Sequence, residues 1–542
     1  MHYRAAVGVV LAALLFAATA SAETYFVDPA QGKSSNNGSK ATPWRTLEEV
    51  MAGGRVKSGD TVLLRDGDHG RAVFSGDNAE FVTIAADEGC KPQLSYLEIT
   101  QGSKWRIKGL VISASFAKQP YEGVMVKVAD GGASGEIIVE DCFVYSTLDA
   151  SKWTASDWMK ANSGMTMGRH GTGHVFRNNY VLNTRFAINL CAENSLCEGN
   201  VVSHFSADGI RVTRDGQVVQ HNVIRNIYVD DKDGDKNHDD AIQCFLFNKG
   251  TGTVRNVTIR ENLIVMRENE DQPHKATMQG IGFFDGPLID FVVEGNVINT
   301  SHWHGVSLYD AQGCKILNNV AYTQWTEEKL RPWVELGSKD TGPVKGNQVK
   351  GNYAYTFKLS NDKEVVAENN QTVTPAVHQK RQAELLAVID EKHGKLHPVA
   401  GFRRLGLEKF RWAEGKVVDG ESGPEIDTIA AALGKGKPIV LFVFTRDDKD
   451  ARGTDACRQF EREVLDDEEV GKLLDQCTTI GIQLGDELPR EVRKLYGIGS
   501  KAPQIVILGP DGKEVWSGKP GNAKALVKRL EAALQGISSD GG

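Results

Sequence analysis

The chain has 542 residues, a net charge of −8, an apolar content of 40% and a charged content of 25%. This length exceeds one ordinary hydrophobic core, so we expect two or more domains. The composition is typical of a soluble globular protein, and the acidic balance argues against nucleic acid as the main partner. Eight cysteines without a C-x-x-C pair exclude a disulfide-scaffold fold and a C-x-x-C zinc site.

The first residues have the pattern of a secretory signal. His2 and Arg4 precede an apolar run from residue 5 to residue 18, and residues 20–22 read Ala-Ser-Ala, as at a cleavage site. We predict a signal peptide over residues 1–22 and a secreted or periplasmic mature protein, with a retained anchor as the alternative. No later run approaches the roughly eighteen apolar residues of a membrane span, so none is predicted.

An asparagine recurs at the start of short apolar segments that are rich in β-branched residues. The spacing is 21 to 23 residues, lengthened to 33, 34 or 40 where the chain has insertions. A coil of three short strands and three turns needs about 22 residues. Stacked strands lie about 4.8 Å apart, so these asparagines should lie above one another and hydrogen-bond along the stack. The members are Asn179, Asn200, Asn222, Asn262, Asn296, Asn319 and Asn352, with Cys142 in the equivalent place one coil earlier.

A second column supports the same register. Each of its segments has isoleucine or valine at the fourth position, which should point into the coil while its two neighbours point outward. The segments are residues 185–190, 207–212, 239–244, 278–283 and 303–308.

These columns resemble the right-handed parallel β-helix of the pectate-lyase superfamily. Residues 25–29, 43–47 and 57–62 are similar to the opening of many secreted β-helix proteins, where a short helix, here 46–51, caps the stack. A cap is also physically needed, because an uncovered coil exposes apolar core and unpaired strand edges. The resemblance implies a mainly β solenoid over residues 23–358. It does not select a reaction, since the superfamily contains lyases, hydrolases, epimerases, phage depolymerases and adhesins.

Residues 359–424 interrupt the repeat and are predicted to form a linker with one helix. The tract 360–374 is polar, whereas residues 379–393 have helical spacing of Leu385, Leu386, Val388 and Ile389. We expect this helix to pack against the far end of the solenoid.

Residues 425–538 follow a different order of elements. We predict strands at 438–444, 478–484, 504–508 and 514–516, with helices at 456–465 and 523–534. This order, with Pro503 before a strand, resembles the thioredoxin fold. Cys457 then takes the place of the second cysteine of the family's C-x-x-C, and Thr454 takes the place of the first. Because the attacking thiol is missing, the resemblance implies a redox-inactive domain with an unknown protein partner, and a lone reactive Cys457 thiol is the alternative.

Stacking the coils also predicts one outward patch about three coils tall, on the order of 15 Å. Mixed polar and aromatic side chains suit a sugar chain, although a solvated surface is the alternative for each residue alone. Two aspartates on adjacent coils repel unless a cation, proton or substrate is present. The patch comprises Asp208, Arg211, His238, Asp240, Gln243, His302, His304 and Tyr309, with Asn189 on the same face and Lys275 on a long insertion that could overhang it.

An acidic insertion precedes Asp240. Asp231, Asp233 and Asp235 alternate with other residues as the oxygen ligands of a calcium loop do. The run departs from the EF-hand order, because Gly234 comes early and no glutamate closes the loop. We predict Ca²⁺ here, with a solvated acidic turn as the alternative.

The resemblance to uronate lyases implies β-elimination on an acidic polysaccharide that contains uronic acid. This reaction needs a cation at the carboxylate, a base for the C5 proton and an acid for the leaving oxygen. Arg211 or calcium would supply the cation, His238 or His304 the base, and Tyr309 the acid. Lys275 is a reserve base.

Three alternatives remain open. C5 epimerisation begins with the same proton abstraction. Glycoside hydrolysis would use Asp208 and Asp240, whose separation of about 5 Å suits retention better than inversion. Non-catalytic polysaccharide binding or adhesion is the third.

Overall fold

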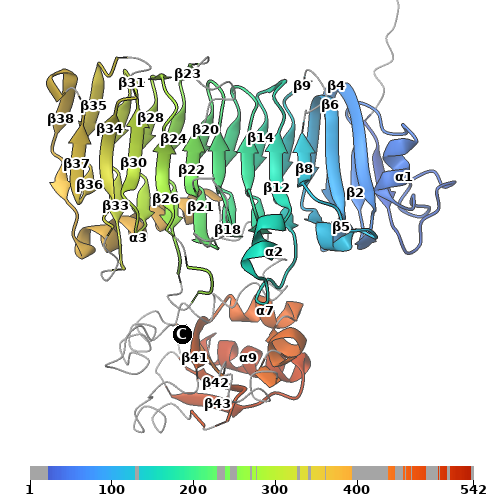
Figure 1. Cartoon of the computed structure of the whole chain (residues 1–542). Helices are drawn as coiled ribbons and strands as arrows, with labels where there is room; N and C mark the ends of the chain where they lie inside the picture. Colours follow the sequence, from blue (N-terminus) through green and yellow to red (C-terminus); the bar gives the residue numbers. More distant parts are fainter. Residues whose placement is uncertain are drawn as a thin grey trace, which may run out of the picture.

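The structure is a computed structural model, and it contains a stack of parallel coils and a separate small sheet with helices (Figure 1). It describes residues 22–128, 134–228, 239–244, 253–268, 272–275, 277–325, 330–339, 343–360, 362–393, 437–445, 456–457, 459–465, 467–483, 498–499, 501–509 and 513–538. The first unit confirms the predicted parallel β solenoid.

Each coil contributes one short strand to each of three parallel ladders. The first ladder contains β8 (Val124–Val128), β12 (Ser163–Met167), β16 (Ile188–Leu190), β19 (Ile210–Val212), β22 (Asp240–Cys244), β26 (Gln279–Phe283), β30 (His304–Tyr309), β34 (Trp333–Gly337) and β37 (Thr356–Leu359). The second contains β10 (Ile138–Glu140), β14 (Val175–Arg177), β17 (Leu196–Glu198), β20 (Val218–Gln220), β24 (Thr258–Arg260), β28 (Val292–Glu294), β32 (Lys315–Leu317), β35 (Asn347–Lys350) and β38 (Val365–Glu368).

The third ladder is a sheet of its own. It contains β3 (Gly67–Asp68), β5 (Pro92–Leu94), β7 (Val111–Ser113), β11 (Phe143–Tyr145), β15 (Tyr180–Thr184), β18 (Val201–Phe205), β21 (Val223–Ile227), β25 (Leu263–Val265), β29 (Val297–Asn299), β33 (Val320–Tyr322), β36 (Tyr353–Ala354) and β39 (Gln371–Thr372).

Two long strands, β4 (Arg71–Ala86) and β6 (Tyr96–Lys108), join the first two ladders at the N-terminal end of the stack. The short strands β1 (Thr24–Val27) and β2 (Thr61–Leu64) continue the second ladder beyond β4, and β9 (Ser134–Gly135) and β13 (Gly171–Thr172) pair beside β6. A small parallel sheet lies just before the second-ladder strands of three successive coils. It consists of β23 (Val254–Arg255), β27 (Leu288–Ile289) and β31 (Ala311–Gln312). Short helices α2 (Ala155–Lys160), η1 (Ala114–Phe116) and η2 (Asp362–Glu364) lie in the connections.

Both predicted columns are confirmed by the strand pairing. Ile188, Ile210, Ile242, Ile281 and Val306 pair in register across adjacent strands and are at most 1% exposed. Each asparagine of the first column after Asn179 accepts, at 2.9–3.0 Å, the backbone N–H and the side-chain amide of the asparagine one coil before it. Cys142 occupies the predicted place, since its N–H donates to Asn179 Oδ1.

The cap at the N-terminal end agrees with the prediction. Helix α1 (Leu47–Ala52) begins after Thr46, whose hydroxyl accepts the Glu49 N–H. Leu47 and Val50 are buried in the main core, so the apolar face of α1 covers the open coil.

The end of the stack differs from the prediction. The coils continue past residue 358, because β38 pairs with β35 and β39 pairs with β36, within the segment predicted as linker. Asn370 extends the asparagine column by accepting from Asn352. The strands of this last coil are short and largely exposed: β38 has the sequence Val-Val-Ala-Glu within a polar tract, and β39 is Gln-Thr.

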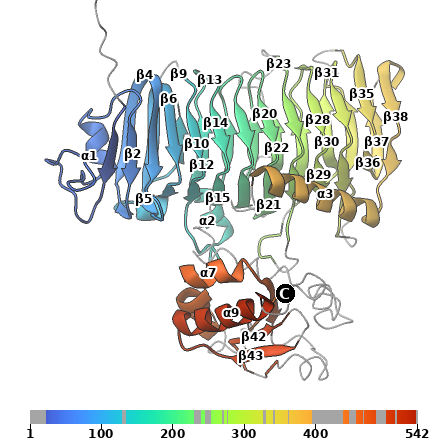
Figure 2. The ribbon, with the colours of Figure 1, turned by 180° about the vertical axis from the view of Figure 1, so that it is seen from behind.

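Helix α3 (Pro375–His393) also lies elsewhere than expected. It packs along the side of the stack, across β33, β29 and β25, and not on its end (Figure 2). Its buried Leu385 and Ile389 contact the outward apolar side chains of the third ladder. Because those side chains point out of the coil, the helix supplies the apolar cover that they lack.

The second unit has a four-stranded sheet with the order β41 (Thr478–Gln483), β40 (Ile439–Phe444), β42 (Gln504–Leu508), β43 (Glu514–Gly518). Strands β40 and β41 are parallel, whereas β42 and β43 run antiparallel to their neighbours. A π-helical turn η5 (Glu461–Leu465) and helices α7 (Glu468–Leu474) and α9 (Ala523–Ser538) contribute to its apolar core. Among the described helices of the chain, none is long and apolar enough to cross a membrane.

Candidate functional site

The outer face of the first ladder carries two rows of side chains at matching positions of successive strands. Neighbours along a row are about 4.8 Å apart, the spacing of parallel strands. The first row contains Asp240, Gln279, His304 and Trp333, and Asp208 lies next to Asp240. The second row contains Asn189, Arg211, Gln243, Gly282, Ser307 and Glu335.

One half of the face is a buried polar network on β19 and β22. The Arg211 guanidinium donates to Asp208 Oδ2 at 2.5 Å, and the Asp240 N–H donates to Asp208 Oδ1 at 3.2 Å. Gln243 Nε2 donates to Asp240 Oδ2 at 2.9 Å. The side chains of Asp208 and Asp240 have no exposed surface, so a polymer on this face would meet Arg211 and Gln243 first.

The surroundings of Asp240 favour the protonated form of its carboxyl group. Burial, followed by the nearby Asp208 carboxylate, raises its pKa well above the usual aspartate value, although the Gln243 amide opposes this. Its Oδ1 is buried, and no described residue donates a hydrogen bond to it. This oxygen lies over Gly282, where an added Cβ would approach to 2.6 Å, so the glycine leaves room for the acid.

The other half of the face centres on His304. Its Nδ1 lies 2.8 Å from Ser307 Oγ, which also accepts the Trp333 indole N–H at 3.3 Å and donates to Glu335 Oε2 at 3.4 Å. An indole N–H can only donate, and the single serine proton is used towards the carboxylate. With the serine proton directed to Glu335, His304 Nδ1 donates to Ser307 Oγ, and this tautomer has its lone pair on Nε2.

Glu335 joins His304 to Tyr309. Its Oε2 lies 3.5 Å from His304 Nδ1 and accepts from the Tyr309 hydroxyl at 3.3 Å. Burial raises the pKa of Glu335, but the hydrogen bond and charge of His304 outweigh it, so the net pKa is below the usual value. Burial, followed by the Glu335 charge, raises the pKa of Tyr309 to about 12, so the phenol keeps its proton at neutral pH.

Aromatic rings surround this centre. The rings of Trp303 and Trp333 are parallel within 6° at 5.9 Å, and Trp303 is 48% exposed. Phe284 contacts the rings of both His304 and Tyr309. Exposed indoles beside hydrogen-bonding groups offer the apolar faces and polar partners that a sugar ring needs.

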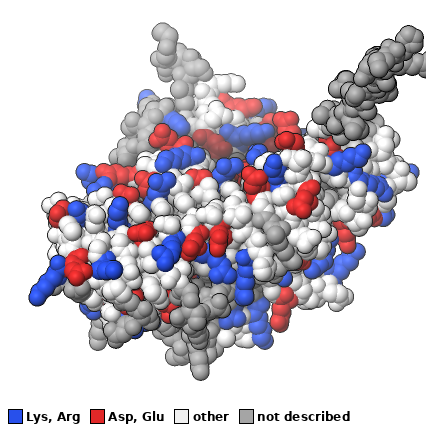
Figure 3. Space-filling model, turned by 90° about the horizontal axis from the view of Figure 1, so that it is seen from above, with Lys and Arg blue, Asp and Glu red and all other residues white. Residues whose placement is uncertain are grey.

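Two lysines bring positive charge to the same area. The Lys339 ammonium lies 5.6 Å from the Tyr309 ring centre and 5.8 Å from that of Phe284. The Lys358 ammonium lies 3.2 Å above the Trp333 ring. On the face seen from above in Figure 3, basic and acidic side chains are mixed. On the outer face of the first ladder, Lys339 and Lys358 are cations that could each contact an anionic chain.

The structure brings together many of the predicted residues. Asp208, Arg211, Asp240 and Gln243 form the first half of the face, and His302, His304 and Tyr309 belong to the second, where the His302 ring stacks on His304 at 5.3 Å. Asn189 continues the second row beside Arg211, and its buried Oδ1 accepts from no described residue. Lys275 is exposed. His238, Asp231, Asp233 and Asp235 lie outside the described residues.

Arg211 is less suited to the role predicted for it. Its charge is compensated by Asp208. Three strand spacings, about 14 Å, separate β19 from β30, which carries His304 and Tyr309. An arginine on β19 is therefore too far away to contact a sugar ring that lies at His304.

Sequence reasoning missed Trp333, Glu335 and Lys339. The pairing of β30 with β34 shifts between His304 and Val306, because Trp333 pairs with His304 while Val334 pairs with Val306. Strand β34 therefore has one residue fewer than β30 between these two pairs. A sequence alignment with a fixed number of residues between positions does not match the outward residues of β34 to those of the other strands. The alternation Trp333-Val334-Glu335-Leu336 was the available signal.

Comparison with known proteins adds fold likenesses only. No protein-family model matches the chain, and no curated protein matches it. Among solved structures, XylC in complex with xylose aligns with a TM-score of 0.41 and 10% identity, over 61% of this chain and 75% of that chain. Pectate lyase Pel9A aligns with a TM-score of 0.38 and 13% identity, over 60% and 80%. The A-module of the Azotobacter vinelandii mannuronan C-5 epimerase AlgE6 aligns with a TM-score of 0.33 and 14% identity, over 60% and 92%.

Proposed function

We propose that this protein is a polysaccharide lyase that cleaves a polymer containing uronic acid by β-elimination, with His304 as base and Tyr309 as acid. The observation that carries the proposal is the Glu335 carboxylate, which contacts both His304 Nδ1 and the Tyr309 hydroxyl. A carboxylate behind a histidine orients the ring and stabilises the imidazolium that forms when it accepts a proton.

The proton transfers follow from the hydrogen bonds. His304 Nε2 takes the C5 proton, and the electron pair of that bond forms the C4–C5 double bond. The bond from C4 to the glycosidic oxygen breaks, and Tyr309 donates its proton to the departing oxygen. A phenol with a pKa of about 12 is protonated before the reaction, as an acid must be.

Elimination also requires the uronate carboxylate to be neutralised. We assign this role to Lys339, because its ammonium lies beside the Tyr309 and Phe284 rings and its ion pair with Asp285, at 3.8 Å, is open to solvent. Arg211 is excluded because it lies three strands from β30 and pairs with the buried Asp208. The exposed Trp303 would stack on a neighbouring sugar. A calcium ion at Asp231, Asp233 and Asp235 remains a proposal, which a chelator tests: loss of activity restored by Ca²⁺ supports it, and indifference removes it.

The proposal is tested by incubating the full chain with a panel of uronic polymers and following the ultraviolet absorbance of unsaturated uronate ends. His304→Gln and Tyr309→Phe should each lower kcat by about 100- to 10,000-fold, the usual contribution of a general base or acid. Substitution of the exposed His170 by glutamine is the matched control and should leave kcat unchanged.

Other outcomes separate the alternatives. New reducing ends without ultraviolet absorbance would indicate hydrolysis, and inverted uronates in an uncut polymer would indicate C5 epimerisation. Retention on the polymer without any product would indicate a binding protein or adhesin. Full lyase activity in both His304→Gln and Tyr309→Phe would move the reaction away from this cluster.

We also propose that residues 437–538 form a thioredoxin-like domain without dithiol activity, which binds an unidentified protein partner. The support is the four-stranded sheet, in which β40 pairs parallel with β41 and antiparallel with β42, and β42 pairs antiparallel with β43. Helices α7 and α9 pack into the apolar core of the same unit. Cys457 is fully buried, and the Thr445 N–H lies 3.4 Å from its sulfur. Because a reactive thiol must be accessible, a structural role is favoured. Alkylation of native protein should therefore leave Cys457 unmodified.

We further propose export, as the pattern of residues 1–22 predicts, and N-terminal sequencing of the mature protein would test the cleavage site.

A further inference from the structure

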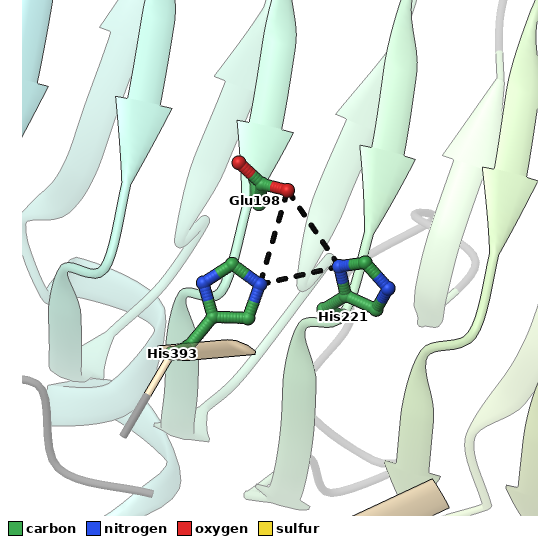
Figure 4. Close-up of side chains that lie close together, drawn as sticks. All are labelled: Glu198, His221 and His393. Atoms are coloured by element: carbon green, nitrogen blue, oxygen red, sulfur yellow. Dashed lines mark hydrogen bonds and ion pairs between the residues drawn. The ribbon is translucent and has the colours of Figure 1, made fainter. Parts of the chain in front are cut away.

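The C-terminal end of helix α3 meets the corner of the coils between the second and third ladders. Its last residue, His393, lies beside His221 and Glu198, far from both in sequence (Figure 4). The three side chains are 3%, 8% and 17% exposed for His221, His393 and Glu198, respectively. Among the described residues, these three form a group that could hold a metal ion.

The ligand atoms have the spacing of a tetrahedral site. His393 Nε2 is 3.2 Å from His221 Nδ1, and Glu198 Oε1 is 3.6 Å from His221 Nδ1 and 3.8 Å from His393 Nε2. Zinc bonds to nitrogen and oxygen of about 2.0 to 2.1 Å place tetrahedral ligands about 3.3 Å apart. The three atoms therefore need to move by only a few tenths of an ångström around an ion.

The opposite nitrogen of each ring is already engaged by an oxygen acceptor. His221 Nε2 lies 2.7 Å from Glu261 Oε2, and His393 Nδ1 lies 3.0 Å from Asn178 Oδ1. If those nitrogens carry the hydrogens, the lone pairs of His221 Nδ1 and His393 Nε2 face each other and the Glu198 carboxylate. Three acceptors that converge repel one another without a cation. A carboxylate behind a metal-binding histidine is also a recurrent feature of metal sites.

Two groups compete with a metal ion at this corner: the Gln220 amide donates to Glu198 Oε1 at 2.5 Å, and Lys392 lies beside His221. The Lys392 ammonium is 3.1 Å from His221 Nε2 and 3.6 Å from Glu261 Oε2. If it donated to Nε2, the ring hydrogen would lie on Nδ1 and oppose metal binding. The shorter contact, from His221 to Glu261, favours the arrangement that leaves Nδ1 free of hydrogen.

The backbone supports a dedicated site. The residue before each asparagine of the column has a left-handed backbone conformation. Glycine and asparagine adopt this conformation most readily, and at most coils the residue is one of these two. His221 and Glu261 adopt it with φ of 55° and 50°. At the same position, Gly199 leaves room for His393, because an added Cβ would lie 2.6 Å from its Nδ1.

We propose that Glu198, His221 and His393 bind one zinc-class divalent ion, which fastens the end of helix α3 to the middle of the solenoid. The two imidazoles and one carboxylate are zinc ligands, and three protein ligands leave a fourth position for water. The inference is independent of the proposed lyase reaction, which uses the outer face of the first ladder.

The test uses the full chain, freed of metal by dialysis against a chelator. Zinc titration by calorimetry should give one equivalent of binding, and cobalt(II) should give the intense visible bands of a tetrahedral ion. Zinc should also raise the Tm of the apo protein, because it binds only the folded site. Glu198→Gln and His393→Gln should lose the cobalt bands and the zinc-dependent rise in Tm.

Two further variants sharpen the result. Glu261→Gln, which alters the shared partner of His221 and Lys392 but no proposed ligand, should weaken zinc binding by about 10- to 100-fold. Lys392→Met changes the residue next to His393 but no ligand, and it should bind zinc at least as tightly because a nearby positive charge is gone. Absence of stoichiometric zinc binding in the unsubstituted chain would overturn the proposal. So would unchanged binding in both Glu198→Gln and His393→Gln.

Discussion

Asn222 illustrates how single side chains hold the coils in register. Its Oδ1 accepts both the N–H and the side-chain amide of Asn200, while its own amide donates to Asn262 and to the Cys197 carbonyl. One residue therefore satisfies buried groups on three successive coils. Water has no access to this position, because Asn222 is fully buried.

Replacing Asn222 by alanine should destabilise the solenoid by about 3 kcal/mol, since buried donors of Asn200 lose their acceptor. Urea unfolding of both proteins measures the difference. Asn370→Ala is the matched control, because Asn370 accepts in the same way from Asn352 but is only partly buried. Water can replace its bonds, so we expect a cost of about 1 kcal/mol. Equal costs at the two positions would show that burial does not govern the column.

His174 should make stability depend on pH. It is fully buried, accepts the Ile137 N–H at Nδ1, and burial lowers its pKa to about 4. Between its unfolded pKa of about 6.5 and that value, the unfolded chain binds a proton that the folded chain does not. The free energy of unfolding should therefore fall as pH decreases from 6.5 to 4, by about 3 kcal/mol in total.

The measurement is the difference between the original chain and His174→Gln, followed by urea unfolding from pH 7 to pH 4. The difference cancels the contributions of other groups, which titrate in both proteins. If the two curves stay parallel, the His174 ring is protonated in the folded state or exposed to water.

At the scale of elements, helix α3 depends on a narrow apolar contact with the third ladder. Leu385 is buried in that contact, whereas the adjacent Leu386 is only partly buried against it. Leu385→Ala should therefore cost about 2 to 4 kcal/mol of docking free energy, and Leu386→Ala about 1 kcal/mol. Hydrogen exchange of the α3 amides reports the docking directly. Similar exchange in both variants would mean that α3 is held mainly by its His393 end.

Sequence periodicity predicts an element well only where the repeat is intact. The inward isoleucines and the asparagine column were predictable because each coil repeats the same contacts. Strand β34 was not, because the irregular pairing at His304 shifts its outward residues by one position and conceals Trp333 and Glu335. The last coil was missed as well, since β38 and β39 are short, largely exposed and embedded in a polar tract.

At the scale of the whole molecule, the parts that the sequence did not predict are contacts between distant segments. The position of α3 on the side of the stack depends on outward apolar residues of several coils. The sequence of the helix does not indicate which of these residues it will contact. His393 and His221 are 172 residues apart and meet only because the coils bring the corner under the helix. By contrast, Asp208, Arg211, Asp240 and Gln243 were grouped correctly because they repeat from one coil to the next.

The path of α3 decides where the chain leaves the solenoid. Its 19 residues span about 28 Å, or about six coil spacings, and they run back from the last coil towards Asn178 and His221. The described part of α3 therefore ends at the middle of the stack. Tension applied at His393 would enter the solenoid at its central coils, and the last coils would bear little load while α3 stays docked.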